Sequence, residues 1–160
     1  MNKIVLLIIL ALLFNSCNQH LVYTDYKTIS ENKWHKDSIV DFEIDIKDTI
    51  SNNGIYINLR NNKNYGFNNI FLIVSVDYPN KTIITDTLSY KMTDQTGRFL
   101  GTGFTDIKEN KLEFKEHIIF ANKGKHTFHI QQAMRKNGEE YGVINLEGIT
   151  DVGIEIEKLK

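Results

Sequence analysis

The chain has 160 residues and carries 19 Lys and Arg against 20 Asp and Glu, for a formal net charge of −1. This balance excludes the strongly basic surface that nucleic-acid binding requires. The single cysteine excludes an intramolecular disulfide. The length suits one domain with its own hydrophobic core.

The N-terminus has the features of a bacterial export signal. Lys3 precedes an apolar run over residues 4–14, which is shorter than the roughly 20 residues that a membrane-spanning helix needs. A buried N-terminal helix is disfavoured because the run has no polar face. Ser16 and Cys17 follow it and resemble the lipobox of bacterial lipoproteins, in which the thiol receives a diacylglyceryl group before cleavage. We therefore predict a signal peptide over residues 1–16 and stable lipid anchoring through Cys17.

The segment after the cysteine is polar and broken by single apolar residues. We predict that residues 17–32 form a lipidated tether and that residues 33–160 form one domain. No acidic residue directly follows Cys17, which favours the periplasmic side of the outer membrane over display at the cell surface. The sequence contains no basic cluster, so it gives no sign of a second, electrostatic contact with the membrane.

Alternating apolar and polar residues predict β-strands through most of the domain. Residues 40–46 and 55–60 alternate with the period of two that marks half-buried strands, and Asn53-Gly54 between them predicts a turn. Residues 69–78 are almost continuously apolar, which is typical of a central strand, and residues 79–81 predict a turn after it. Further strands are predicted at residues 82–92, 112–120, 125–134 and 151–159.

Seven or eight short strands with no long helical period predict an all-β fold. We expect an antiparallel two-sheet β-sandwich of jelly-roll type. A flexible loop excursion is expected at residues 137–145.

The polar residues give no catalytic or metal-binding set. His126 and His129 have odd spacing in a predicted strand, so they lie on opposite faces and cannot share a metal ion. Asp41, Glu43 and Asp45 share one strand face, where a solvated face is a simpler explanation than a Ca²⁺ site. The glycine-rich residues 97–103 lack the Lys-Ser/Thr ending of a phosphate loop and indicate a tight turn instead. We predict no enzyme activity, no cofactor and no metal.

Aromatic residues in or beside loops are the best candidates for contact with a ligand or partner. Trp34, Tyr65, Phe67 and Phe99 occupy such positions. Aromatic side chains at the end of a sandwich can stack on sugars or anchor a protein partner, and packing at the edge of the core is the alternative.

Segments spread in order over most of the mature chain together resemble the gliding motility lipoprotein GldH family of Bacteroidetes. The segments are Trp34-His35-Lys36-Asp37, Leu59-Arg60-Asn61-Asn62, Tyr65, residues 69–72, residues 86–88, Gly97 with Leu100-Gly101 and Gly103, residues 131–135, residues 148–149 and residues 151–153. Gly66 and Phe99 depart from the proline and tryptophan expected there.

The resemblance implies an accessory lipoprotein of the gliding apparatus, linked to type IX secretion and acting through other motility and secretion lipoproteins. Under this implication Arg60 and Arg135 become candidate partner-contacting residues, alongside Trp34, Tyr65 and Phe67. The alternative for each arginine is a local ion pair at a strand end. The alternative function is a glycan-binding lipoprotein module.

Three short motifs resemble the Asp-Ser/Thr-aliphatic O-glycosylation sites of periplasmic Bacteroidetes proteins. They are residues 37–39, 48–50 and 86–88. Because the motif is short, we treat their use as a hypothesis, which peptide mass spectrometry can test through added hexose.

Overall fold

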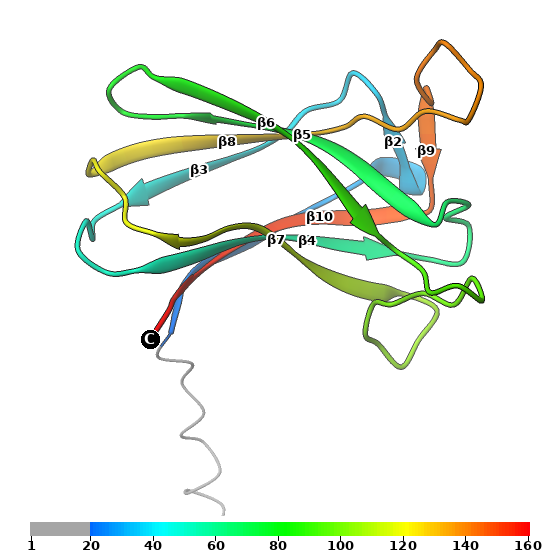
Figure 1. Ribbon diagram of the computed structural model, residues 1–160, viewed down its shortest axis with the longest axis horizontal. Helices are drawn as coiled ribbons and strands as arrows, with labels where there is room; N and C mark the ends of the chain where they lie inside the picture. Colours follow the sequence, from blue (N-terminus) through cyan, green and yellow to red (C-terminus); the bar gives the residue numbers. More distant parts are fainter. Residues whose placement is uncertain (1–19) are drawn as a thin grey trace, which may run out of the picture.

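The computed structural model describes residues 20–160, in which ten β-strands and one short 3-10 turn are joined by loops (Figure 1). The predicted signal peptide and Cys17 lie outside the described residues. The elements are β1 (Leu21–Thr28), η1 (Ser30–Asn32), β2 (Lys33–His35), β3 (Val40–Ile46), β4 (Asn53–Asn61), β5 (Asn69–Asp77), β6 (Ile83–Lys91), β7 (Lys108–Ile118), β8 (Gly124–Gln132), β9 (Asn145–Glu147) and β10 (Ile149–Lys158).

Two four-stranded antiparallel sheets pack face to face. Sheet I has the order β1-β10-β4-β7 and sheet II the order β3-β8-β5-β6, while β2 and β9 form a small separate ribbon. This arrangement of eight strands is a jelly roll, which confirms the predicted fold. β5 lies inside sheet II, as its apolar sequence predicts. The strand count exceeds the prediction because β1, β2 and β9 were not expected.

The core fills the space between the two sheets. In β3 the apolar residues Val40, Phe42, Ile44 and Ile46 are all buried and the residues between them are exposed. They belong to the same core as Ile57 and Ile154, which come from the inner strands of sheet I. Burying one such side chain contributes about 1.5–3 kcal/mol to the free energy of unfolding. The buried residues of the alternating pattern therefore stabilise the packing of the two sheets.

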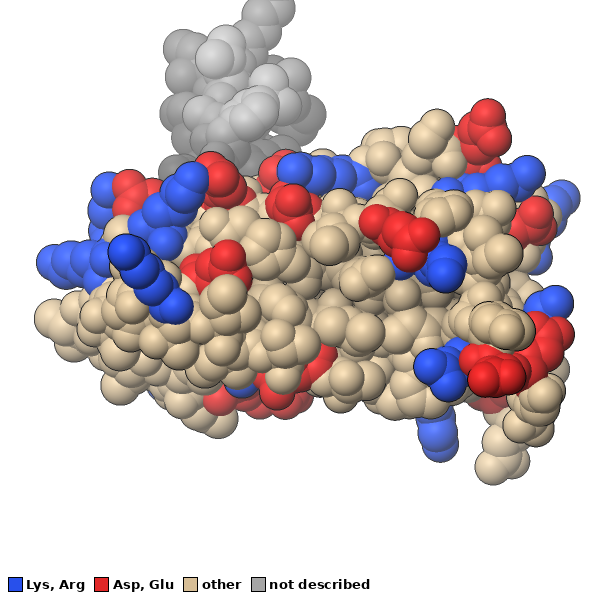
Figure 2. Space-filling model, turned by 90° about the horizontal axis from the view of Figure 1, so that it is seen from above, with Lys and Arg blue, Asp and Glu red and all other residues tan. Residues whose placement is uncertain are grey.

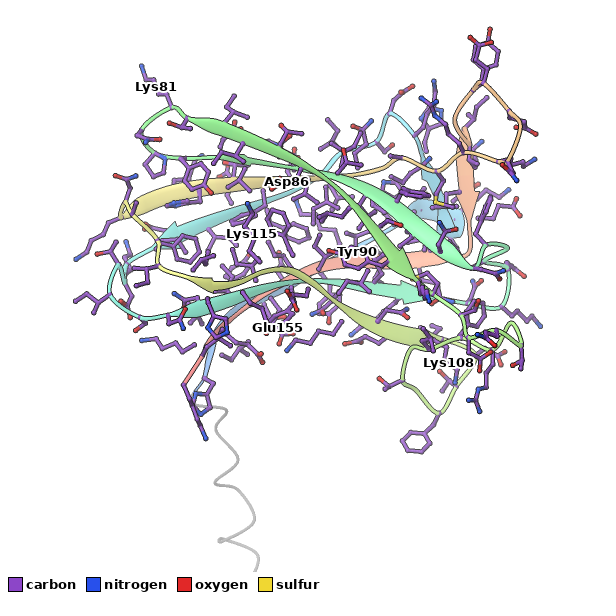
Figure 3. The ribbon with its side chains drawn as sticks, in the orientation of Figure 1. Lys81, Asp86, Tyr90, Lys108, Lys115 and Glu155 are labelled. Carbon is purple, nitrogen blue, oxygen red and sulfur yellow. The ribbon has the colours of Figure 1, made fainter. Side chains whose placement is uncertain are left out.

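Polar contacts join the sheets where β6 faces β7. The Asp86 carboxylate points inward from β6 and forms an ion pair with Lys115 Nζ at 3.0 Å (Figure 3). In the same region the Tyr90 hydroxyl donates a hydrogen bond to the Glu113 carbonyl oxygen at 2.5 Å. An inward-pointing charge on an edge strand disfavours pairing with another strand, so Asp86 also protects this edge.

The start of the domain differs from the prediction. Residues 21–28, assigned to the tether by the sequence, form β1 and pair with β10 from Thr28↔Asp151 to Leu21↔Glu157. β1 lies at the edge of sheet I, and only Tyr23 and Tyr26 are half-buried along it. It therefore lacks the apolar stripe that reveals a strand in a sequence. Of the residues predicted to form the tether, the structure describes only His20 before the first strand.

The predicted turn at Asn53-Gly54 is also wrong, because both residues belong to β4. The turn is made by residues 47–52, where Asp48 accepts hydrogen bonds from the backbone N–H groups of Ile50 and Ser51 at 2.9 and 3.0 Å. Gly54 serves a different purpose: a Cβ there would lie 2.7 Å from the Tyr56 hydroxyl oxygen. The predicted turn at residues 79–81 is confirmed.

The sandwich has two distinct ends. At one, which we call the proximal end, β1 begins beside the last strand, and the Lys158 N–H donates to the His20 carbonyl oxygen at 2.7 Å (Figure 1). The loops at residues 47–52 and 119–123 lie there too. The opposite, distal end carries the loops at residues 62–68, 92–107 and 133–144 together with the β2–β9 ribbon.

Candidate interaction surface

Two of the aromatic residues predicted to contact a partner are buried. Trp34 is 0% exposed and its indole N–H donates to the Ser38 carbonyl oxygen at 2.9 Å. Tyr65 is 4% exposed and its hydroxyl donates to the Asn69 carbonyl oxygen at 2.7 Å, and burial raises its pKa. These residues therefore pack in the core, so the alternative of core packing is the correct one for both.

Tyr65 fixes the loop that carries Phe67. The backbone of Gly148 lies so close to Tyr65 that a Cβ on the glycine would be 2.2 Å from the Tyr65 nitrogen. The Tyr65 ring in turn lies 6.0 Å from the Phe67 ring and 6.5 Å from the Phe99 ring, in tilted arrangements. The structure thus brings three of the predicted loop aromatics into one cluster at the distal end.

Phe67 stands between two grooves on the surface of the distal end. One groove, with a volume of about 740 Å³, is lined by the 62–68 loop and by the side of the 133–144 loop that carries Tyr141 and Ile144. The other, of about 460 Å³, lies between Phe67 and Arg135 and also contacts Phe71. We call the first the distal groove. It is the candidate surface for binding another molecule.

The distal groove combines exposed apolar side chains with charges at its rim. Tyr141 is 80% exposed and Ile144 is 57% exposed, and both line this groove. Lys136 and Glu139 line the same groove, and the Lys136 Nζ lies 3.9 Å from the Glu139 Oε1. Apolar side chains bordered by polar and charged groups are a common arrangement in protein interfaces. Sequence reasoning missed Tyr141 and Ile144, although it did predict a loop excursion over their segment.

The two candidate arginines lie in different surroundings. Arg60 Nε donates to Glu109 Oε2 at 2.7 Å and its guanidinium lies 4.1 Å from the Tyr26 ring centroid. The hydrogen bond to Glu109 raises the pKa of Arg60, and burial together with Glu109 raises that of Tyr26 to about 12. Arg60 is thus engaged on the outer face of sheet I, whereas Arg135 is exposed beside the Phe67 grooves.

Each acidic residue of β3 contacts a basic side chain. Asp41 accepts from His129 Nδ1 at 2.7 Å, Glu43 forms an ion pair with Lys125 at 2.8 Å, and Asp45 contacts Lys47. Within residues 20–160 no group of three His, Asp or Glu side chains is arranged to hold a metal ion.

The two strand histidines lie on opposite faces of sheet II, as predicted. His129 faces outward, next to Asp41 and Asp77. His126 is buried, in edge-on contact with the rings of Tyr78 and Phe120, each 5.3 Å away.

The glycine-rich segment forms a tight turn, as predicted. Asp94 Oδ1 accepts hydrogen bonds from the backbone N–H groups of Thr96 and Arg98 at 2.9 and 3.0 Å, and Gly97 has a φ of +82°. Phe104 extends fully into solvent from the same loop.

The hydroxyl residues of the three glycosylation-like motifs differ in exposure. Ser38 and Thr87 are exposed and Thr49 is half-buried. Their modification stays a prediction.

The fold and surface define the class of protein. It is a jelly-roll domain with a surface groove at one end, and none of its described helices is long and apolar enough to cross a bilayer. Residues 21–156 match the family described as GldH lipoprotein. The chain belongs to this family, and is therefore a lipid-anchored protein of the cell envelope.

Two relatives match nearly the whole chain. A gliding motility lipoprotein GldH homolog of Christiangramia forsetii is 50% identical over 147 residues, which cover 92% of this chain and 90% of that protein. The gliding motility lipoprotein GldH of Flavobacterium johnsoniae is 46% identical over 153 residues, which cover 96% and 94%. The resemblance seen in the sequence is confirmed.

Solved structures are much more distant. A GH115 4-O-methyl-α-glucuronidase has a TM-score of 0.43 and 10% identity, with 91% of this chain and 18% of that chain covered. This likeness carries no functional argument.

Proposed function

We propose that this lipoprotein is an accessory component of the gliding motility apparatus, linked to type IX secretion, and that it acts by binding other motility and secretion lipoproteins. The distal groove is the observation that supports an interaction role, because Tyr141 and Ile144 are exposed there beside half-buried Phe67 and the charged groups of Lys136 and Glu139. The names of the two relatives support the gliding context. Cys17, the only cysteine, is the proposed site of lipid attachment in the outer membrane, with the domain facing the periplasm.

The test changes the distal groove without changing the core. Tyr141→Ala and Ile144→Ser remove exposed side chains, so the fold should be retained. Ile83→Ser is the matched control, because Ile83 is 63% exposed on β6 at the other end of the sandwich. Each tagged lipoprotein is recovered from membranes in mild detergent, and co-purifying proteins are identified by mass spectrometry.

We expect the unaltered protein and the Ile83→Ser variant to recover motility or secretion lipoproteins and the groove variants to lose them. A central aromatic anchor contributes about 2 kcal/mol or more to an interface, which corresponds to roughly a 30-fold loss of affinity. In a gliding species, the groove variants should also reduce colony spreading. Equal recovery by all variants would remove the groove from the proposal, and normal spreading of a deletion strain would reject the gliding role.

The glycan-binding alternative is supported by the same exposed Tyr141, because a tyrosine ring can stack on a sugar. Electrophoresis through gels that contain polysaccharides distinguishes the two. Retardation that disappears in Tyr141→Ala, together with a pull-down that recovers no protein, would favour the glycan-binding module.

A further inference from the structure

The proximal end presents apolar and basic side chains that are distant in the sequence. Ile50, at the tip of the β3–β4 loop, is 86% exposed, and Ile119, in the β7–β8 loop, is 59% exposed. Leu21 and Val22 at the start of β1 are also exposed. The described neighbours leave Ile50 and Ile119 mostly exposed and cover Leu21 and Val22 only in part, although each is of a type that is often buried.

Lysines surround these apolar residues. The segments at residues 47–52, 119–123 and 158–160 contain Lys47, Lys123, Lys158 and Lys160, with Asp48 as their one carboxylate side chain. Lys158 is paired with Asp48 at 2.7 Å and Lys47 with Asp45. Among the described residues, no carboxylate pairs with Lys123 or Lys160. Figure 2 shows basic side chains projecting at the left of the molecule, which is the proximal end, with acidic side chains among them.

The position of β1 places this end next to the proposed lipid. Only Asn18, Gln19 and His20 separate Cys17 from Leu21, the first residue of β1. Even a fully extended chain over that distance spans at most roughly 14 Å, so the start of β1 must stay close to the headgroups of an anchoring bilayer. A tether that ended at residue 32, as the sequence suggested, would have left the domain free to move away.

We propose that the proximal end is a membrane-contacting surface, in which Ile50 and Ile119 enter the headgroup region of an anionic bilayer and Lys123 and Lys160 contact its phosphates. Apolar side chains surrounded by lysines are what interfacial membrane binding requires. The sequence has no basic cluster because the fold gathers these lysines from separate loops. This inference rests on the proposed lipid attachment at Cys17 and is independent of any binding partner.

The contact can be measured on the complete lipoprotein in vesicles. The sulfur of Cys17 carries the lipid, so one introduced cysteine provides the only free thiol for a fluorophore. Ile50→Cys and Ile119→Cys probe the proximal end, and Tyr141→Cys is the control at the distal end. Vesicles of phosphatidylethanolamine and phosphatidylglycerol contain a lipid with a nitroxide quencher near its headgroup, and mass spectrometry first verifies the lipid on Cys17.

We expect strong quenching of the labels at residues 50 and 119 and little quenching at residue 141. Equal quenching at both ends would overturn the proposal. Lys123→Gln with Lys160→Gln should shift the equilibrium between docked and undocked domain about fivefold for each lysine, whereas Lys63→Gln with Lys136→Gln at the distal end should not. Identical quenching with phosphatidylcholine alone, or no effect of the proximal lysines, would contradict the electrostatic contact.

The outcomes also separate this inference from the proposed function. Loss of partner lipoproteins in the groove variants with normal quenching would support both. Normal partner recovery with equal quenching at the two ends would leave the proposed function intact and reject the membrane contact alone.

Discussion

At the scale of single residues, Gly148 holds the distal loops in place. Its φ is +87°, and a Cβ would collide with the Tyr65 backbone nitrogen. We predict that Gly148→Ala destabilises the domain by more than the roughly 1–2 kcal/mol that the left-handed conformation alone costs an alanine. Urea unfolding of the purified domain measures the difference.

Gly138 supplies the matched control for this prediction. Its φ is +82°, yet nothing lies within 4 Å of the Cβ position. Gly138→Ala therefore carries the conformational cost without the collision. Equal destabilisation by the two substitutions would show that the close approach to Tyr65 contributes nothing.

His129 gives the domain a pH-dependent contribution to stability. Burial disfavours its charged form, but the hydrogen bonds to Asp41 and Asp77 outweigh this and raise the pKa of His129 above its ordinary value of 6.5. A group whose pKa is raised by folding stabilises the folded state fully below its unfolded pKa and loses this contribution as the pH rises through the folded pKa.

We therefore predict that His129→Gln lowers stability at pH 6 by about 0.2–1 kcal/mol and has a smaller effect at pH 8. Urea midpoints at the two pH values check this. Asp41→Asn removes the charge of one of the two carboxylates that contact His129. It should therefore reduce the difference between the effects of His129→Gln at pH 6 and pH 8. An effect of His129→Gln that is the same at both pH values would exclude the ion pair as its source.

At the scale of elements, β1 belongs to the domain although it buries little. Its contribution to stability comes from backbone pairing with β10 and from the Tyr26 side chain. The Tyr26 ring packs so closely on Gly153 that a Cβ on the glycine would lie 2.6 Å from it. We predict that deletion of residues 18–32, the tether suggested by the sequence, exposes the edge of β10 and causes aggregation.

Deletion of residues 18–20 alone is the control, because it leaves β1 complete. Size-exclusion chromatography and thermal unfolding should show a monomer with near-normal stability for the shorter deletion only. A stable monomer after the longer deletion would mean that β1 is dispensable.

The sequence predicted those strands whose residues alternate between core and solvent. β3 was predicted over the same residues, 40–46, because every second side chain is apolar. β2 and β9 have three residues each, too few to show a period, yet Trp34 and Leu146 pair there and are fully buried. Such burial depends on tertiary contacts that local patterns do not contain.

The candidate surface was predictable only in part. Phe67 was identified because an aromatic residue in a loop needs an explanation, and it does line the distal groove. Its loop neighbour Tyr65 carried the same signal but is buried against Gly148. Tyr141 and Ile144 come from another loop, about 75 residues away, so only the fold joins them to Phe67.

At the scale of the whole molecule, the jelly roll separates two surfaces of different character. The proximal end combines exposed Ile50 and Ile119 with lysines, whereas the distal end has a groove in which Tyr141 and Ile144 lie beside charges of both signs. Because strands cross the molecule between these ends, contact of one end with a bilayer would direct the other away from it. The proposed membrane contact would thus present the distal groove to partners.

This arrangement predicts that the spacing between Cys17 and β1 matters. A Gly-Ser spacer of about ten residues inserted before Leu21 has a mean reach of roughly 16–19 Å, enough to let the domain leave the bilayer without altering its fold. We expect unchanged thermal unfolding, weaker headgroup quenching at residue 50, and reduced colony spreading if presentation of the groove matters. An insertion of only one or two residues is the control and should retain both signals. If the long spacer leaves quenching unchanged, the loops themselves hold the domain on the membrane; if quenching falls while spreading is normal, the orientation of the groove is irrelevant to function.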